Sequence, residues 1–189
     1  MNIRTVAVIG AGPLGRRLAA LISSAGFNTV LEDVLPSNLR KASERLGDGA
    51  AEDQDDPVRV RQLRFATSVE DAVRTSDLIV DSVPDELESK LEIFSLLDRM
   101  APPLAILVTP TKALSIADLA SCTYRADRCV AVQLPSEELL PGEAVVLVST
   151  TQTSTEVLDG VARFWEALGF PTELQLDPSE SSVAAGTLF

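Results

Sequence analysis

The stretch VAVIGAGPLGRRLAA, residues 6–20, decides the fold of this chain. Its β-branched start predicts a strand that is buried on both faces, which is typical of a parallel sheet. Gly10, Gly12 and Gly15 then follow in G-x-G-x-x-G spacing and open a helix. In that context Gly10 permits a tight turn, Gly12 lets the backbone approach a pyrophosphate, and Gly15 lets the helix lie close to the sheet. Free N–H groups and the helix dipole then favour a bound anion.

Along the rest of the chain, apolar runs alternate with segments of helical spacing. Strands are predicted at residues 4–9, 28–33, 63–67, 77–83, 104–109, 129–134, 144–149 and 171–176. Helices are predicted at residues 13–25, 36–46, 69–75, 86–100, 115–121 and 153–168. This alternation indicates βαβ units, so we predict a Rossmann-type, doubly wound α/β fold with a mostly parallel sheet and helices on both faces.

The predicted domain organisation is simple. Residues 1–177 are expected to form one dinucleotide-binding domain, and residues 178–189 a C-terminal tail. The polar segment 47–61 is expected to be a mobile surface loop. On the long helix, the spacing of Glu86 and Lys90 predicts an i,i+4 ion pair.

A carboxylate follows the second predicted strand at the spacing of a dinucleotide site. Asp33 lies 18 residues after Gly15, and the motif places an acidic residue about 20 residues on. A carboxylate there accepts hydrogen bonds from both ribose hydroxyls and repels a 2′-phosphate, so the expected cofactor is NAD rather than NADP. Arg16 and Arg17 weaken that preference. The alternative is a glycine-rich turn that binds no nucleotide.

The composition excludes several classes of function. The net charge is −12, which disfavours binding to nucleic acid or to an anionic membrane. The chain has no histidine, the commonest general base and metal ligand, and no metal site is predicted. No apolar run approaches the roughly 18 residues of a membrane span. Cys122 and Cys129 form no CxxC motif and no leader is visible, so a cytoplasmic protein is expected.

Two longer segments resemble the NAD-binding domain of the 3-hydroxyacyl-CoA dehydrogenase family. VAVIGAGPLGRRLAALISSAGFNTVLEDV, residues 6–34, is similar to the family's opening βαβ unit. TSVEDAVRTSDLIVDSVPDELESKLEIFSLLDRMAPPLAIL, residues 67–107, is similar to its fourth strand, long helix and fifth strand. The resemblance covers about residues 3–177 and implies NAD-dependent oxidation of a 3-hydroxyacyl-CoA. The residues predicted to bind the cofactor are Gly10, Gly12, Pro13, Leu14, Gly15, Asp33, Val83, Pro84 and Lys90.

The family's proton-transfer group has different residues in this chain. In the family a His follows the sixth strand in a Leu-His-Phe-Phe-Asn-Pro segment, a Glu holds that His, and Ser and Asn position the substrate. The resemblance aligns the His with Gln133, the Asn with Ser136 and the Ser with Lys112. The Glu aligns with Val145 or Val146, depending on a one-residue insertion. Because a glutamine has no accessible pKa, little or no hydroxyacyl-CoA dehydrogenase activity is expected.

Three hypotheses about function follow from these replacements. In the first, the chain is a stand-alone NAD(H)-binding domain that has lost the dehydrogenase chemistry. In the second, it is an NAD-dependent oxidoreductase for another substrate, in which Lys112, Asp81 or Tyr124 transfers the proton. In the third, it is an interaction module that binds no nucleotide.

The resemblance also implies binding partners. In the family a helical C-terminal domain closes the substrate cleft and usually makes the dimer, whereas only Asp177 and Pro178 of its entry segment are kept here. We therefore expect an uncovered apolar face and a homo-dimer or hetero-oligomer formed through it. Acyl-CoA is the substrate class that the resemblance implies.

Overall fold

The computed structural model describes residues 2–49, 63–136 and 138–181. The strands are β1 (Thr5–Ile9), β2 (Asn28–Glu32), β3 (Leu63–Ala66), β4 (Leu78–Asp81), β5 (Ile106–Pro110), β6 (Cys129–Gln133), β7 (Val145–Ser149) and β8 (Thr172–Leu176). The α-helices are α1 (Pro13–Ser24), α2 (Pro36–Gly49), α3 (Val69–Val73), α4 (Leu87–Met100), α5 (Ile116–Ala120), α6 (Thr155–Ala167) and α7 (Pro178–Ser181). A short 3₁₀ helix, η2 (Ala126–Arg128), precedes β6.

The strands form one sheet in the order β3-β2-β1-β4-β5-β6-β7-β8. Neighbouring strands are parallel except for β6 and β7, which are antiparallel. The first six positions follow the order of the doubly wound dinucleotide fold, and the order reverses between β1 and β4. The predicted fold class is therefore confirmed. Ligands of such folds bind outside the carboxyl ends of the strands at this switch point.

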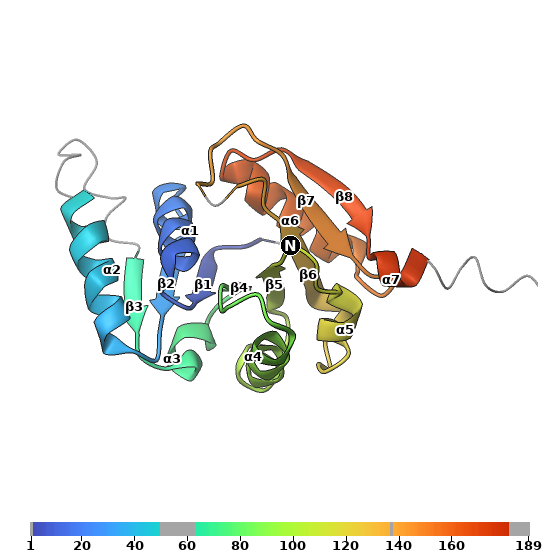
Figure 1. Cartoon of the computed structure of the whole chain (residues 1–189), viewed down its shortest axis with the longest axis horizontal. Helices are drawn as coiled ribbons and strands as arrows, with labels where there is room; N and C mark the ends of the chain where they lie inside the picture. Colours follow the sequence, from blue (N-terminus) through green and yellow to red (C-terminus); the bar gives the residue numbers. More distant parts are fainter. Residues whose placement is uncertain (1, 50–62, 137, 182–189) are drawn as a thin grey trace, which may run out of the picture.

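Helices cover both faces of the sheet, and Figure 1 shows α1 and α6 on one face and α3, α4 and α5 on the other. The central strand β1 supplies both cores, because successive side chains of a strand point to opposite faces. Val6 and Val8 join the core under α1 and α6, whereas Ala7 and Ile9 join the core under α3, α4 and α5. Burial on both faces explains the unbroken apolar run that predicted this strand.

The residues after β8 pack against the domain. Asp177 is buried and accepts hydrogen bonds from Ser115 Oγ (2.9 Å) and from the Ala117 N–H (3.1 Å) at the start of α5. Glu180 in α7 accepts a 2.6 Å bond from the Thr151 N–H. The predicted tail thus begins with a docked helix, and residues 182–189 lie outside the described residues.

The first residues of the segment 47–61, which was predicted to be a surface loop, are helical. Helix α2 extends to Gly49, three residues beyond the expected end of the helix. The remainder of that segment lies outside the described residues.

Candidate functional site

The glycine loop joins β1 to α1 at the carboxyl edge of the sheet. Gly10 has φ +99°, a backbone conformation that side-chain-bearing residues rarely adopt. A Cβ on Gly15 would lie 1.9 Å from the Gly10 carbonyl oxygen and 2.5 Å from Ser82 Oγ, so only glycine fits there. A Cβ on Gly12 would meet nothing within 4 Å, which leaves open space beside the loop backbone. These three positions fit the turn, the ligand approach and the close helix–sheet contact of a dinucleotide loop.

The N-terminus of α1 is open to an anion. Gly12 is its N-cap and supplies no side-chain hydrogen bond, and the first turn contains no acidic residue. Arg16 Nη1 donates a 2.7 Å hydrogen bond to the Ala11 carbonyl oxygen and so braces the loop. The unpaired N–H groups and the helix dipole therefore meet the requirement for a pyrophosphate at this end.

Asp33, directly after β2, holds the loop from the other side. Its Oδ2 accepts hydrogen bonds from the Ala11 N–H (2.9 Å) and from Asn38 Nδ2 (3.0 Å), and its Oδ1 accepts one from the Leu35 N–H (2.8 Å). A carboxylate oxygen accepts about two hydrogen bonds, so Oδ1 keeps an acceptor site for a ribose hydroxyl. Asp33 thus contacts the glycine loop, and its predicted contact with the ribose stays a prediction.

Beside Asp33, Glu32 is a buried acid that the sequence did not single out. Its side chain is 2% exposed and Oε1 has no hydrogen-bond partner. The strand register places Glu32 beside Ile9 of β1 and Ala66 of β3, on the apolar face under α3. Burial, together with the neighbouring Asp33 carboxylate, raises the pKa of Glu32 to about 7. The only sequence signal was an acidic residue within the predicted strand, directly after Val30 and Leu31.

A buried ionic cluster lies two strands away. Lys90 of α4 is 0% exposed, and its Nζ lies 3.0 Å from Asp81 Oδ2 and 2.9 Å from Thr109 Oγ1. Thr109 Oγ1 also donates to Asp81 Oδ2 at 3.0 Å. Burial raises the pKa of Asp81, and the Lys90 ammonium opposes that shift.

The prediction of a Glu86–Lys90 ion pair is wrong. Glu86 is the exposed N-cap of α4, whereas Lys90 lies on the inner side of the helix, where the Asp81 carboxylate holds its ammonium. The predicted contact between Lys90 and the cofactor stays a prediction, and in this arrangement the donors of Lys90 point into the protein.

Gln133 and Lys112 lie at the carboxyl ends of two neighbouring strands, β6 and β5. Gln133 is the last residue of β6 and lies directly opposite Val146 of β7 in the antiparallel ladder. The register therefore selects Val146 rather than Val145 as the cross-strand neighbour. Lys112 follows β5, and its N–H donates a 3.0 Å hydrogen bond to Asp85 Oδ2.

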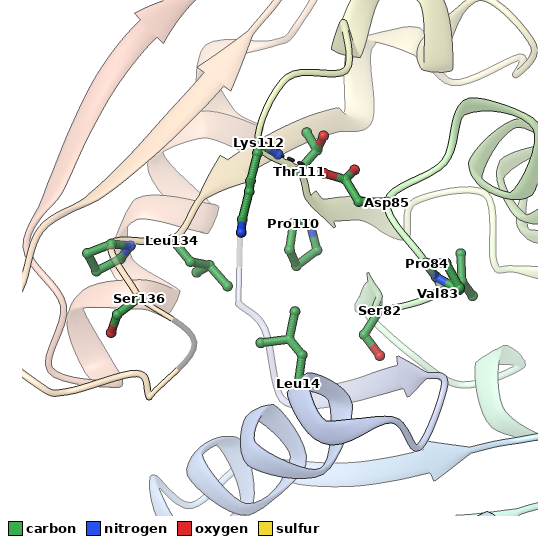
Figure 2. Close-up of a pocket in the computed structure, with 11 residues that line it drawn as sticks. Leu14, Ser82, Val83, Pro84, Asp85, Pro110, Thr111, Lys112, Leu134 and Ser136 are labelled. Atoms are coloured by element: carbon green, nitrogen blue, oxygen red, sulfur yellow. Dashed lines mark hydrogen bonds between the residues drawn. The ribbon is translucent and has the colours of Figure 1, made fainter.

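Two cavities open at this edge of the sheet. The first has a volume of about 390 Å³, and its lining includes Leu14, Ser82, Val83, Pro84, Lys112 and Leu134 (Figure 2). The second, of about 310 Å³, is lined in part by Lys112, Gln133, Val148 and Asp177. The structure thus brings the predicted cofactor residues Leu14, Val83 and Pro84 together with Lys112, while Gln133 lies at the second cavity. The sequence did not predict Ser82, Asp85 or Leu134 as lining residues, because they carry no motif.

The fold and this site define a Rossmann-type dinucleotide-binding domain. A family model described as "3-hydroxyacyl-CoA dehydrogenase, NAD binding domain" matches residues 5–171. The chain belongs to this family. The expected family and the expected cofactor, NAD, are therefore confirmed.

Among individual relatives, the chain is 28% identical over 180 residues to the mitochondrial hydroxyacyl-coenzyme A dehydrogenase of Sus scrofa, covering 88% of this chain and 57% of that protein. It is 28% identical over 138 residues to a probable 3-hydroxybutyryl-CoA dehydrogenase of Bacillus subtilis, covering 69% and 48%. The chain thus spans about half the length of these curated relatives.

Solved structures share the fold. A diketoreductase structure is 26% identical with a TM-score of 0.83, over 93% of this chain and 65% of that one. The 3-hydroxybutyryl-CoA dehydrogenase of Escherichia coli K12 has a TM-score of 0.84 at 23% identity, over 94% of this chain and 39% of that one. Across residues 2–49, 63–136 and 138–181, no helix is long and apolar enough to cross a membrane.

Proposed function

We propose that this chain binds NAD(H) through the glycine loop and Asp33 but carries little or no hydroxyacyl-CoA dehydrogenase activity. The observation that carries the proposal is the cross-strand pair Gln133–Val146, which stands at the carboxyl edge of the sheet where the resemblance puts a His and its Glu. Neither side chain titrates, and the chain contains no histidine. Loss of a general base typically lowers a rate by about 10²- to 10⁴-fold.

The proposed binding mode follows from the two halves of the fold. The half built on β1–β3 holds the adenosine, with the pyrophosphate at the N-terminus of α1 and the ribose at Asp33. The half built on β4–β6 holds the nicotinamide, which we place in the 390 Å³ cavity beside Leu14, Val83 and Pro84. NAD supplies a hydride acceptor when bound, and Leu14, Val83 and Pro84 offer the ring an apolar contact surface.

A second candidate function is an oxidoreductase for another substrate, with Lys112 as the proton-transfer group. The observation that favours it is the position of Lys112 in the lining of both cavities. The other two residues considered for this role are poorly placed. Asp81 is buried and paired with Lys90, and Tyr124 is fully exposed after α5 and lines neither cavity.

Calorimetric titration with NAD, NADH and NADP tests the proposal, with Asp33→Ala as the variant. We expect binding of NAD and NADH, weaker binding of NADP, and loss of NAD affinity in the variant. No heat with any nucleotide would instead favour the interaction module. Incubation with NAD and 3-hydroxybutyryl-CoA should form no NADH, and turnover near the family's rate would overturn the proposed loss of activity.

We also propose that the chain forms a homo-dimer or hetero-oligomer, and that β8 contributes to the contact. Strand β8 ends the sheet among the described residues, and Leu174 and Leu176 on it are 63% and 40% exposed. Both side chains lie on one face of the strand because residues i and i+2 do so. Light scattering of the wild type and of Leu174→Lys tests the homo-dimer. A wild type that stays monomeric at high protein concentration contradicts it, as does a Leu174→Lys variant that dimerises as the wild type does.

A further inference from the structure

Lys112 has a fixed main chain, and its ammonium group has no partner among the residues that the structure describes. Its N–H is bound to Asp85 Oδ2 at 3.0 Å, and the preceding Thr111 donates its N–H to the Val132 carbonyl oxygen at 3.1 Å. Thr111 Oγ1 also accepts a 3.0 Å hydrogen bond from the Leu114 N–H. Within the part of the chain that the structure describes, Lys112 Nζ has neither a hydrogen bond nor an ion pair. Hydrogen bonds therefore hold the turn at several points, and the Lys112 ammonium is left available to a ligand.

This ammonium points into the larger cavity. Figure 2 shows the Lys112 side chain running away from Asp85, towards Leu14, with Pro110 on one side and Leu134 and Ser136 on the other. Its own backbone N–H engages the Asp85 carboxylate, which is the one acidic group in the described lining of this cavity. Lys112 is also the one cationic side chain in the described lining of either cavity.

The surroundings favour an anion beside Lys112 over a lysine that merely points to solvent. The protein carries a net charge of −12, so an anion binds only where a local cation offsets the overall negative potential, as Lys112 does in this cavity. Three of the cavity's lining side chains, Leu14, Leu134 and Val83, are aliphatic and supply no counter-charge. Lys112 is itself exposed, but a charge-assisted hydrogen bond beside these aliphatic side chains is stronger than one in open water.

We propose that Lys112 is the anion-binding residue of a substrate-like subsite for small hydroxy or oxo acids with a free carboxylate. The inference rests on the proposed placement of the nicotinamide in the same cavity, because the acid would then lie beside the ring. A cavity of about 390 Å³ is within the size range of small-molecule sites and takes a nicotinamide together with a small acid. The free carboxylate, rather than a thioester, is the group that a lone ammonium recognises.

The test is a titration of 3-hydroxybutyrate into the protein saturated with NADH. The reduced cofactor and the hydroxy acid form a dead-end complex, so heat reports binding without turnover. The neutral isostere 3-hydroxybutyramide is titrated in parallel. The variants are Lys112→Met, which removes the charge but keeps the length, and Lys112→Arg, which keeps a charge. Lys41→Met is the matched control, because Lys41 is an exposed lysine on α2 that lines neither cavity.

We expect Lys112→Met to weaken 3-hydroxybutyrate binding by about 10- to 100-fold, as for a lost hydrogen bond to a charged group. Lys112→Arg and Lys41→Met should bind the acid to within a few-fold of the wild type, and the amide should bind all four proteins alike. Equal affinities in Lys112→Met and Lys41→Met overturn the inference, as does a wild-type NADH complex that does not bind the acid.

The same titration separates this inference from the proposed function. If Lys112→Met weakens NADH itself while the acid is unaffected, the ammonium serves the cofactor's pyrophosphate and the subsite is refuted. If none of the four proteins binds NADH, the proposed cofactor site is wrong. The acid is then titrated into the cofactor-free proteins, and the same comparison of variants shows whether Lys112 binds it.

Discussion

Gln133, the last residue of β6, lies directly across the antiparallel ladder from Val146 of β7. A cross-strand pair of this kind brings two side chains to the same face within contact distance. The sheet therefore still supplies the geometry in which an acid–base pair would be held. Neither Gln133 nor Val146 has a titratable side chain, and the proposed loss of dehydrogenase activity rests on this observation.

The first prediction concerns Gln133. Gln133→Ala should leave both the NAD affinity and the residual rate of NADH formation from 3-hydroxybutyryl-CoA unchanged, because a glutamine takes up no proton. The rate is measured by absorbance with excess NAD, against a protein-free control. A fall of about 10²-fold or more would show that Gln133 serves a catalytic step, and the proposed loss of activity would then be wrong.

The second prediction compares two glycines of the loop. Gly15→Ala should lower the free energy of unfolding by about 1–3 kcal/mol, since its Cβ would overlap the Gly10 carbonyl oxygen. Gly12→Ala should leave stability nearly unchanged, because its Cβ meets nothing within 4 Å and its φ of −65° suits alanine. We expect Gly12→Ala nevertheless to weaken NAD binding, because the methyl group occupies the space beside the loop.

Urea unfolding and NAD titration measure the two effects separately. Equal stabilities of the two variants would contradict the close contact between Gly15 and Gly10. An unchanged NAD affinity in Gly12→Ala would contradict the placement of the pyrophosphate at this loop.

The third prediction is a pH dependence caused by Glu32. Its pKa is about 7 in the folded protein, against an ordinary value of 4.5. Between these two values the unfolded chain ionises more readily than the folded one, so the free energy of unfolding falls as pH rises, and the loss is complete above about pH 7. Glu32→Gln removes the charge, and at pH 8 it should be more stable than the wild type by up to about 3 kcal/mol.

Denaturant unfolding from pH 4.5 to 8 measures the difference. The difference between the two proteins should be smallest near pH 4.5, where Glu32 is protonated in the folded protein and about half protonated in the unfolded chain. Glu173→Gln, at an exposed position on β8, is the control and should run parallel to the wild type. A constant difference between Glu32→Gln and the wild type across this range would show that Glu32 does not titrate with a raised pKa.

The fourth prediction concerns the Asp81–Lys90 pair. Lys90→Met should lower the free energy of unfolding by about 3–5 kcal/mol, because it leaves the Asp81 carboxylate buried without its partner. The double variant Lys90→Met/Asp81→Asn should recover part of that loss, since neither group is then charged. Unfolding of both single variants and the double variant gives the coupling free energy, and strictly additive effects would contradict the pair.

Chemical modification checks the burial of Lys90 independently. The lysines of the chain are Lys41, Lys90 and Lys112. Reductive methylation of the folded protein, read by peptide mass spectrometry, should modify Lys41 and Lys112 and leave Lys90 unmodified. The double variant, titrated with NAD, also tests the predicted contact between Lys90 and the cofactor, because it removes the ammonium without leaving an unpaired charge.

The sequence by itself determined the architecture and the cofactor class. Local signals suffice for both, because a glycine pattern between a buried strand and a helix, followed by an acidic residue at the right distance, has few other solutions. Gly10 forms the expected turn and Gly15 the expected close contact, while the binding of NAD by these residues and by Asp33 stays a prediction. The end of α2 was placed three residues early because Gly47 is a typical helix-ending residue, whereas the helix continues to Gly49.

Only the tertiary structure decided which charged groups lie inside the protein and which residues face one another. The four-residue spacing of Glu86 and Lys90 suggested that they pair on one face of the helix. In the structure the face of α4 that carries Lys90 packs against the sheet, so the partner of Lys90 is Asp81. The antiparallel register selects Val146 as the neighbour of Gln133. The convergence of β4, β5 and β6 at one edge brings Ser82, Lys112 and Leu134 around a cavity. Such contacts join residues far apart in the chain, and local pattern contains no information about them.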